Sequence, residues 1–175
     1  YRTFFLFLWP SALESLLVGL IGSIDTMMVG TLGENAINAV GITNQPKFIL
    51  LAIIFSLNVG VTAVVARRKG QNDADGANRT MRAAILLSAA FSLTASALGF
   101  LFARPILTFA GADPIYLDDA VIYFRILCVS IVFTALNLTI NAAQRGCGNT
   151  KISMRTNIVA NVVNVILNYV LIYGH

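Results

Sequence analysis

The sequence predicts an all-α membrane protein, a polytopic bundle of transmembrane helices. Hydrophobic residues make up 57% of the 175-residue chain and charged residues only 11%, whereas soluble domains carry roughly 25% charged residues. The apolar residues gather in five long runs, each matching the roughly 20 helical residues needed to cross a hydrocarbon core of about 30 Å. Composition and run length together exclude an ordinary soluble domain.

Five membrane spans are expected, with loops between them. Their approximate bounds are residues 4–29, 45–66, 80–103, 117–142 and 153–173. An odd number of spans places the two ends of the sequence on opposite sides of the membrane. We therefore expect residues 1–175 to form an incomplete N-terminal transmembrane lobe, with the remaining half of the same polypeptide beyond His175.

The first span is the longest, and it contains a proline and an acid in apolar surroundings. Its 26 residues would form a helix of about 39 Å, so it must tilt or bend. Pro10 is the expected bend, because proline removes a backbone donor and clashes with the preceding turn. Asp25 is expected to be an ion, proton or substrate site, since a carboxylate at mid-helix costs about 2.5 to 3.5 kcal/mol. A buried structural acid paired with a neighbouring helix is the alternative.

The second and third spans carry weaker polar patterns. Asn58 and Thr62 lie one turn apart in the second span, and Ser88, Ser92 and Ser96 recur every four residues in the third. Small residues at such spacings let helices approach each other closely in membranes. We interpret both sets mainly as packing faces.

Polar stripes run along the fourth and fifth spans. The residues recur at spacings of 4, 3 and 4, which places them on one face of each helix. The stripes are Ser130, Thr134, Asn137 and Asn141 in the fourth span, and Asn157, Asn161, Asn164 and Asn168 in the fifth. They serve either as hydrogen-bond contacts between helices or as the wall of a polar cavity. Two full stripes and an acid favour a cavity, with a lining that includes Asn137, Asn141, Asn157 and Asn161.

Asp25 and two asparagines of the fifth span are expected at similar depths in the membrane. Asp25 lies about 6 Å below the outer end of its span, and Asn168 about 8 Å below the outer end of the fifth. If the two helices are neighbours, Asp25, Asn164 and Asn168 can meet in the outer half of the membrane. A carboxylate, two amide oxygens and water suit Na⁺ or a proton, whereas Mg²⁺ sheds its water reluctantly.

Basic residues are distributed unevenly between the two sides of the predicted bundle. Nine of the twelve Lys and Arg fall at the N-terminus or in the loops after the second and fourth spans. The positive-inside rule then places the N-terminus in the cytoplasm. We expect a multi-pass protein of the plasma (cytoplasmic) membrane, with the loops at 67–82 and 144–155 inside and those at 31–44 and 104–116 outside. Arg125, near the start of the fourth span, is expected to snorkel or to pair with Asp118 or Asp119.

The remaining composition argues against several classes of site and partner. The two cysteines, Cys128 and Cys147, do not make a disulfide framework, and the only histidine is His175. Zinc and haem are therefore not expected, and neither is any metal beyond a possible Na⁺ at Asp25. A net charge of +4 with basic residues confined to short loops gives no reason to expect a nucleic-acid partner.

The sequence resembles the multidrug and toxic compound extrusion (MATE) family of secondary transporters. The resemblance covers nearly the whole chain and rests on the order and spacing of several strings. These are LWPSALESLL, SIDTMMVGTLGENAINAVG, GVTAVVARRKGQND and QRGCGNTKISMRTNIVANVVNVILNYVLIYG. The chain would then supply the first five of twelve helices, arranged in two six-helix lobes.

The resemblance implies an antiporter that exports cationic or amphipathic small molecules in exchange for Na⁺ or H⁺, with no other cofactor. Pro10 and Asp25 look like the family's first-helix proline and acid, and Asn164 and Asn168 like its fifth-helix polar pair. Members with a well-defined cation site often carry an acid at the second position of that pair. Asn168 departs from this pattern, which leaves Na⁺ and H⁺ both open.

Three other functions were weighed against the antiporter. A lipid-linked oligosaccharide flippase of the same superfamily should line its cavity with several cations, but beyond the first three residues of each span the spans offer only Arg125. An intramembrane aspartyl protease needs two membrane-embedded aspartates, and beyond those first residues the spans offer only Asp25. A scaffold subunit explains neither Asp25 nor the asparagine stripes. We therefore expect a transporter and no catalytic residues.

Overall fold

The computed structural model describes residues 33–173 and, before them, residues 16, 19, 20, 22, 23, 27, 30 and 31; the side chains at 168 and 171–173 are not described. All elements in this part of the chain are helices. They are α2 (Glu34–Gly70), α3 (Ala74–Leu101), α4 (Ala103–Phe109), α5 (Leu117–Gly146) and α6 (Thr150–Tyr173). The all-α prediction is confirmed.

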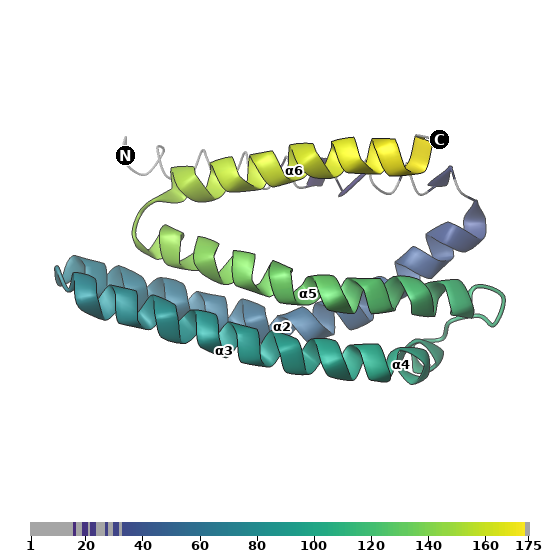
Figure 1. Ribbon diagram of the computed structural model, residues 1–175, viewed down its shortest axis with the longest axis horizontal. Helices are drawn as coiled ribbons and strands as arrows, with labels where there is room; N and C mark the ends of the chain where they lie inside the picture. Colours follow the sequence, from purple (N-terminus) through teal and green to yellow (C-terminus); the bar gives the residue numbers. More distant parts are fainter. Residues whose placement is uncertain are drawn as a thin grey trace. The chain divides into compact units, whose positions relative to one another are not determined.

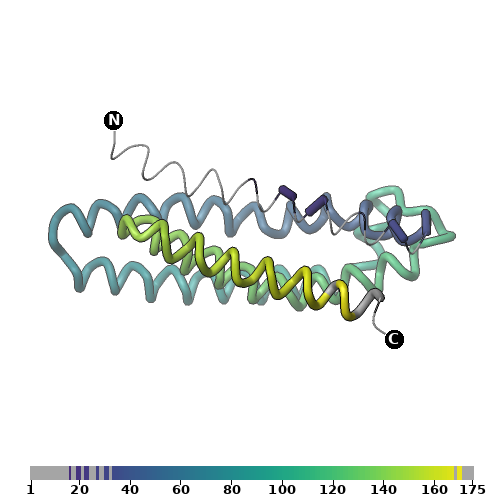
Figure 2. Tube along the Cα trace, turned by 90° about the horizontal axis from the view of Figure 1, so that it is seen from above, coloured from purple at the N-terminus to yellow at the C-terminus, as the bar shows by residue number. Residues whose placement is uncertain are grey.

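The chain divides into two compact units. One comprises residues 35–148 and contains α3, α4, α5 and nearly all of α2; the other comprises residues 1–34 and 149–175 and contains α6. Within the first unit, α2, α3 and α5 run side by side, with α4 at one end (Figure 1). Seen from above, α2 turns sharply into an antiparallel α3 (Figure 2).

Three helices of the described part are long and apolar enough to cross a membrane, namely α2, α3 and α5. Their outward faces carry large exposed apolar side chains, among them Val59, Leu86 and Phe133, each more than 70% exposed. In water such exposure would be unfavourable, whereas lipid tails are as apolar as these side chains. The three helices therefore form a small bundle that suits a hydrocarbon surrounding.

Helix α2 begins eleven residues before the expected start at Gln45. Residues 34–44, expected as part of a loop, form its first three turns, and Pro46 lies inside the helix. Ala39, Thr43 and Pro46 are all buried, and Ala39 packs in a cluster with Leu107 and other residues of α4 and α5. This packing stabilises helical backbone on both sides of a proline that on local grounds favours a helix start.

The turn between α2 and α3 has clear local causes. Asn72 adopts a left-handed conformation with φ of 55°, which asparagine tolerates better than most residues. Asp73 then caps α3, because its Oδ1 accepts a hydrogen bond of 2.8 Å from the backbone N–H of Gly76. The third helix thus starts at Ala74, six residues before the expected start of its span at Thr80.

The third expected span lies almost wholly in α3, and a short helix follows it. Helix α3 ends at Leu101 and α4 begins at Ala103, with Phe102 at the junction (φ −98°, ψ 19°). The N–H of Phe102 still donates to the carbonyl of Leu98 over 2.9 Å, so the chain turns without losing that bond. The expected span at 80–103 therefore corresponds to α3, whereas the segment at 104–116, expected as a loop, contains most of α4.

The contact between α3 and α5 depends on small side chains. Ala84, Ser88, Ser92 and Gly99 of α3 are buried. The Ser88 and Thr139 hydroxyls lie 2.9 Å apart in a hydrogen bond, and both residues are fully buried. A Cβ on Gly99 would lie only 2.7 Å from Sγ of Cys128. The interpretation of Ser88 and Ser92 as a packing face is confirmed.

Helices α2 and α5 also approach closely. A Cβ on Gly146 would lie 2.8 Å from the backbone oxygen of Thr62 and 3.0 Å from Cβ of Val65. The Thr62 hydroxyl is 3.1 Å from the carbonyl oxygen of Ala142, within hydrogen-bonding distance. Close backbone approach with a hydroxyl contact is how helices associate without a hydrophobic driving force.

Candidate functional site

The polar stripe of α5 lies mostly outside the contacts of that helix with α2 and α3. Ser130, Thr134 and Asn137 are exposed, while Asn141 is only 4% exposed. The Nδ2 of Asn141 donates to Oδ1 of Asn137 over 3.0 Å. The two asparagines expected in the cavity wall are thus joined to each other, and they form a polar patch on one face of α5.

The Ser130 and Thr134 hydroxyls in the same stripe are satisfied within α5. Ser130 donates to the carbonyl of Leu127 over 2.8 Å, and Thr134 to the carbonyl of Ser130 over 3.0 Å. Bonds of this kind allow a hydroxyl to face an apolar surrounding without a partner on another helix. These two residues therefore contribute less polarity to the patch than the asparagines do.

The asparagines of the fifth span lie on α6. Asn157 and Asn161 are half-buried and Asn164 is exposed, at the spacings of 4 and 3 that place them on one face. Asn168 belongs to the same helix, and its side chain lies outside the described residues, as do Asp25 and Pro10. The structure therefore places Asn137 and Asn141 together on α5 and three of the α6 asparagines along one face of that helix.

A cavity between α2 and α5, mostly apolar but with three polar residues in its lining, was not recognised from the sequence. It has a volume of about 580 Å³, and its polar lining residues are Asn58, Thr62 and Arg145. Leu138 of α5 and apolar residues of α2, including Phe55 and Val59, complete its wall. The cavity thus lies between two of the helices that are suited to cross the membrane.

Asn58 gives this cavity its distinctive chemistry. The residue is 7% exposed, and its Oδ1 has no hydrogen-bond partner among the described residues. A buried amide oxygen without a partner is unfavourable by about 1 to 3 kcal/mol. It can accept a hydrogen bond from water or from an N–H or O–H donor, so the cavity is suited to bind a polar group. The one-turn spacing to Thr62 in an apolar run is the signal for this site, and from the sequence we interpret that pair mainly as a packing face.

The basic loop after α2 contains an acid whose role was also missed. Asp73 caps α3 and forms an ion pair of 2.8 Å with Arg68. The hydrogen bond from the Gly76 backbone is the main cause that holds the pKa of the Asp73 carboxyl below its ordinary value of 3.8; burial opposes it, and the charges of Arg68 and Arg79 lower the pKa further. An aspartate directly before an alanine-rich helical run is a recognisable N-cap signal.

Two further expectations about single residues can be compared with the structure. Arg125 lies over the ring of Phe100, 5.3 Å from its centroid, and Asp118 pairs with Arg104 over 3.1 Å. Of the alternatives expected for Arg125, which are snorkelling or pairing with Asp118 or Asp119, the pairing with Asp118 is not observed, and Arg125 of α5 contacts Phe100 of α3 instead. Cys128 and Cys147 are both free thiols, as expected.

Comparison with known proteins identifies the family. The MatE family model matches residues 10–170. The chain is 28% identical to the "Uncharacterized transporter YisQ" of Bacillus subtilis (strain 168), with 99% of this chain and 38% of that protein aligned. It is 25% identical to "Multidrug resistance protein PmpM" of Pseudomonas aeruginosa, over 95% of this chain and 35% of that protein.

A third relative is named for a metabolite. The "FAD transporter" of Shewanella oneidensis is 27% identical over 86% of this chain and 33% of its own length. The chain thus spans little more than a third of these relatives. No solved structure matches the chain significantly. The names printed for these relatives describe transport and drug resistance and do not favour the flippase.

The family match covers all three helices suited to cross a membrane and both asparagine stripes. MatE proteins are multi-pass membrane transporters and not enzymes, which agrees with the apolar helices and with the expectation from the sequence. This chain belongs to the MatE family, the multidrug and toxic compound extrusion transporters.

Proposed function

We propose that the full-length protein exports cationic or amphipathic small molecules across the plasma membrane in exchange for Na⁺ or H⁺. The observation that carries the proposal is the family match over residues 10–170, together with relatives named as multidrug resistance proteins. Small-molecule substrates and a bilayer setting follow from family membership. The coupling ion and the compounds exported are part of the proposal.

Asp25 is the proposed coupling residue, assisted by Asn164 and Asn168. A carboxylate in an apolar stretch is a functional group by default, and two amides one turn apart can complete its coordination. The division of the chain is compatible with this grouping, because residues 1–34 and 149–175 belong to the same unit. In this scheme the acid binds a cation or a proton in one state of the transporter and releases it in the other.

The proposed substrate cavity is polar on the side of α5. The Asn137–Asn141 pair and the Oδ1 of Asn58, which has no hydrogen-bond partner among the described residues, offer hydrogen-bond acceptors to the N–H groups of an amine. Asn157 and Asn161 on α6 extend the proposed lining. Neutral acceptors can orient an organic cation through hydrogen bonds. Because they carry no negative charge, they bind it weakly enough for release.

The test compares Asp25→Asn with wild-type full-length protein in membrane vesicles. The variant keeps the size of the side chain and removes its charge, so gradient-driven efflux of a cationic dye should fall to the level of vesicles without the protein. Protein amounts must match, and Asp113→Asn serves as the control, because it removes an acid in the loop between α4 and α5, outside the proposed site. If Asp25→Asn supports efflux at the wild-type rate, Asp25 is a structural acid and the proposed mechanism is wrong.

A second variant asks what Asn168 contributes. Asn168→Asp supplies the second acid found in members with a well-defined cation site, so it should tighten Na⁺ binding or shift the pH at which efflux is fastest. Efflux measured against imposed Na⁺ and H⁺ gradients separately distinguishes the two coupling ions. An unchanged ion and pH dependence would remove Asn168 from the proposed site.

A further inference from the structure

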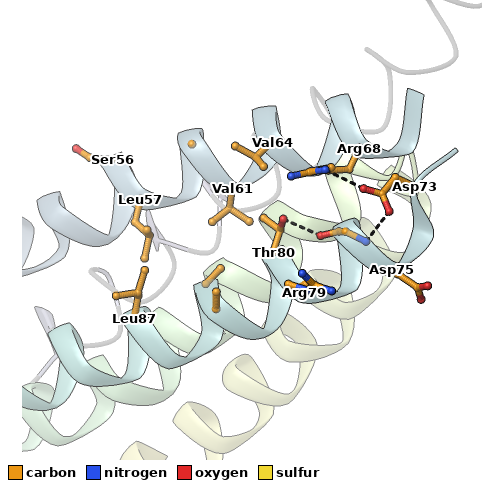
Figure 3. Close-up of a pocket in the computed structure, with 14 residues that line it drawn as sticks. Ser56, Leu57, Val61, Val64, Arg68, Asp73, Asp75, Arg79, Thr80 and Leu87 are labelled. Atoms are coloured by element: carbon orange, nitrogen blue, oxygen red, sulfur yellow. Dashed lines mark hydrogen bonds and ion pairs between the residues drawn. The ribbon is translucent and has the colours of Figure 1, made fainter. Parts of the chain in front are cut away.

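A groove between α2 and α3 is independent of the proposed transport site. It has a volume of about 550 Å³ and lies at the end of these helices that adjoins the turn at residues 71–73. Figure 3 shows its two contrasting parts. Leu57, Val61 and Val64 of α2 face Leu87 of α3 at one end, and charged residues surround the other end.

The apolar part of the groove forms a line along α2. Leu57, Val61, Val64 and Arg68 follow at spacings of 4, 3 and 4, so they share one face of the helix. From Leu57 to Arg68 this face extends about 16 Å, at 1.5 Å per residue. Half of a hydrocarbon core is about 15 Å thick. The line therefore matches the depth of one leaflet and ends in a cation.

The charged end of the groove has a positive balance. Arg68 is paired with Asp73 over 2.8 Å. Arg79 is near enough for its charge to lower the pKa of Asp73, but it makes no ion pair with any residue that the structure describes. The Thr80 hydroxyl lies beside it and donates to the carbonyl of Gly76 over 2.8 Å. Residues 67–82 together contain five basic and two acidic side chains. Arg79 is thus available to an anionic group.

We propose that this groove binds an anionic phospholipid from the leaflet at the α2–α3 turn. Arg79 holds the headgroup phosphate, with Arg68 shared between that phosphate and Asp73, and one acyl chain lies along Leu57, Val61 and Val64. Arginine suits phosphate because its planar fork donates two parallel hydrogen bonds. Basic pockets between transmembrane helices are favourable sites for anionic headgroups. A neutral headgroup would leave Arg79 without a partner at the membrane surface.

The groove also has room for the chain on its α2 side. Gly60 lines it, and a Cβ on Gly60 would meet no atom within 4 Å. Filling this space with a larger apolar side chain would therefore block an acyl chain without disturbing the helix contacts. Gly60→Leu is the variant that tests the apolar part separately from the charges.

The experiment titrates the purified full-length protein in a nonionic detergent with phosphatidylglycerol or with phosphatidylcholine of the same acyl chains, and native mass spectrometry counts bound lipid. Phosphatidylglycerol should bind at least fivefold more tightly. Arg79→Gln should weaken its binding about fivefold, the effect of one basic residue near the surface, and Gly60→Leu should weaken binding of both lipids. Arg82→Gln, a basic neighbour that does not line the groove, is the matched control and should bind like wild type.

Several outcomes would overturn the proposal. Equal affinity for the two lipids would show that charge plays no part, and equal losses in Arg79→Gln and Arg82→Gln would indicate a diffuse surface attraction. Competition by free glycerol phosphate as strong as that by the whole lipid would mean that a soluble phosphate is the ligand. Wild-type phosphatidylglycerol binding in both Arg79→Gln and Gly60→Leu would place the lipid elsewhere on the protein.

Discussion

Single residues set the spacing between the helices of the first unit. Gly146 lets the end of α5 rest against the backbone of Thr62 and the side chain of Val65. Gly99 does the same for α3 against Cys128. Since lipid tails compete equally well for apolar side chains, these close approaches supply much of the attraction between the helices. A methyl group added at Gly146 or Gly99 should therefore destabilise these helix contacts.

We predict that Gly146→Ala destabilises the full-length protein by about 1 to 3 kcal/mol, the usual effect of forcing extra volume into a packed contact. The new Cβ would lie 2.8 Å from a backbone oxygen, which cannot move aside as a flexible side chain could. Thermal unfolding in detergent measures the effect. Gly60→Ala is the matched control, because its Cβ meets nothing within 4 Å, and it should be neutral or stabilise α2 by about 0.5 to 1 kcal/mol. Equal melting temperatures for both variants would contradict the α2–α5 contact.

The hydrogen bond between Ser88 of α3 and Thr139 of α5 joins two fully buried hydroxyls, and its contribution to stability can be measured. Ser88→Ala and Thr139→Val each remove one partner, and a double-mutant cycle isolates their coupling. We expect about 0.6 kcal/mol, with about 1.7 as an upper limit for such bonds in membranes. Thr139→Ser keeps the hydroxyl and should retain the coupling. A coupling of zero would mean that Thr139 is satisfied by the Ala135 carbonyl alone, 2.9 Å away.

At the scale of the element, the structure explains where helices start and stop. Helix α2 passes through Pro46, which is buried, and Ala39 in the turns before it packs against α4 and α5. Helix α3 starts where Asp73 caps it, and α4 follows a junction at Phe102. Capping and burial thus determine helix boundaries that hydropathy alone does not predict.

The Asp73 cap should make the stability of α3 depend on pH in a defined direction. Its pKa is lowered in the folded protein by the Gly76 backbone and by Arg68, so the carboxylate stabilises the fold above the ordinary value of 3.8. That contribution is lost as pH falls below 3.8 and through the lowered pKa. Asp73→Ala should lower the melting temperature at neutral pH, and the difference from wild type should shrink below pH 3.8.

Asp73→Asn is the control for this prediction. The amide oxygen can still accept from the Gly76 N–H, but it has no charge for Arg68 and does not titrate. Its melting temperature should therefore fall between those of wild type and Asp73→Ala at neutral pH. A difference between wild type and Asp73→Ala that persists unchanged to pH 2.5 would exclude the carboxylate as the stabilising group.

At the scale of the whole molecule, the uneven distribution of basic residues predicts an orientation. Residues 67–82 and 144–155, which include the α2–α3 and α5–α6 turns and the adjoining helix ends, hold eight of the twelve Lys and Arg, and positive segments stay in the cytoplasm. The lipid site proposed above would then face the cytoplasmic leaflet. Its binding test in detergent does not depend on that orientation, so the two ideas can be judged separately.

Thiol labelling in intact cells decides the orientation. In a background of Cys128→Ser and Cys147→Ser, the Gln71→Cys variant should resist an impermeant reagent until the cells are opened. The Asp113→Cys variant, at an exposed position in the loop between α4 and α5, should react at once. Reaction of Gln71→Cys from outside, with protection of Asp113→Cys, would show that the orientation is reversed.

The sequence by itself determined the class of protein, the family and the approximate position of the membrane helices, because composition, run length and motif order are local properties. It also located both polar stripes, since helical spacing fixes which residues share a face. The N-cap at Asp73 was equally local and could have been recognised from its neighbours. Asp25 and Asn168 stay predictions as the coupling site.

Only the tertiary structure decided which face of each helix meets a neighbour. On α5 the residues that pack are Phe124, Cys128, Ile131, Ala135, Thr139 and Ala142, beside the polar stripe and with a helical spacing of their own. Both faces carry small residues, so volume and spacing could not distinguish them. Tertiary contacts also decide the environment of Pro46 and Asn58. Both residues are buried in α2. The helix continues through Pro46, and the Asn58 Oδ1 has no hydrogen-bond partner among the described residues. Contacts of this kind depend on where other helices pass, which no local pattern records.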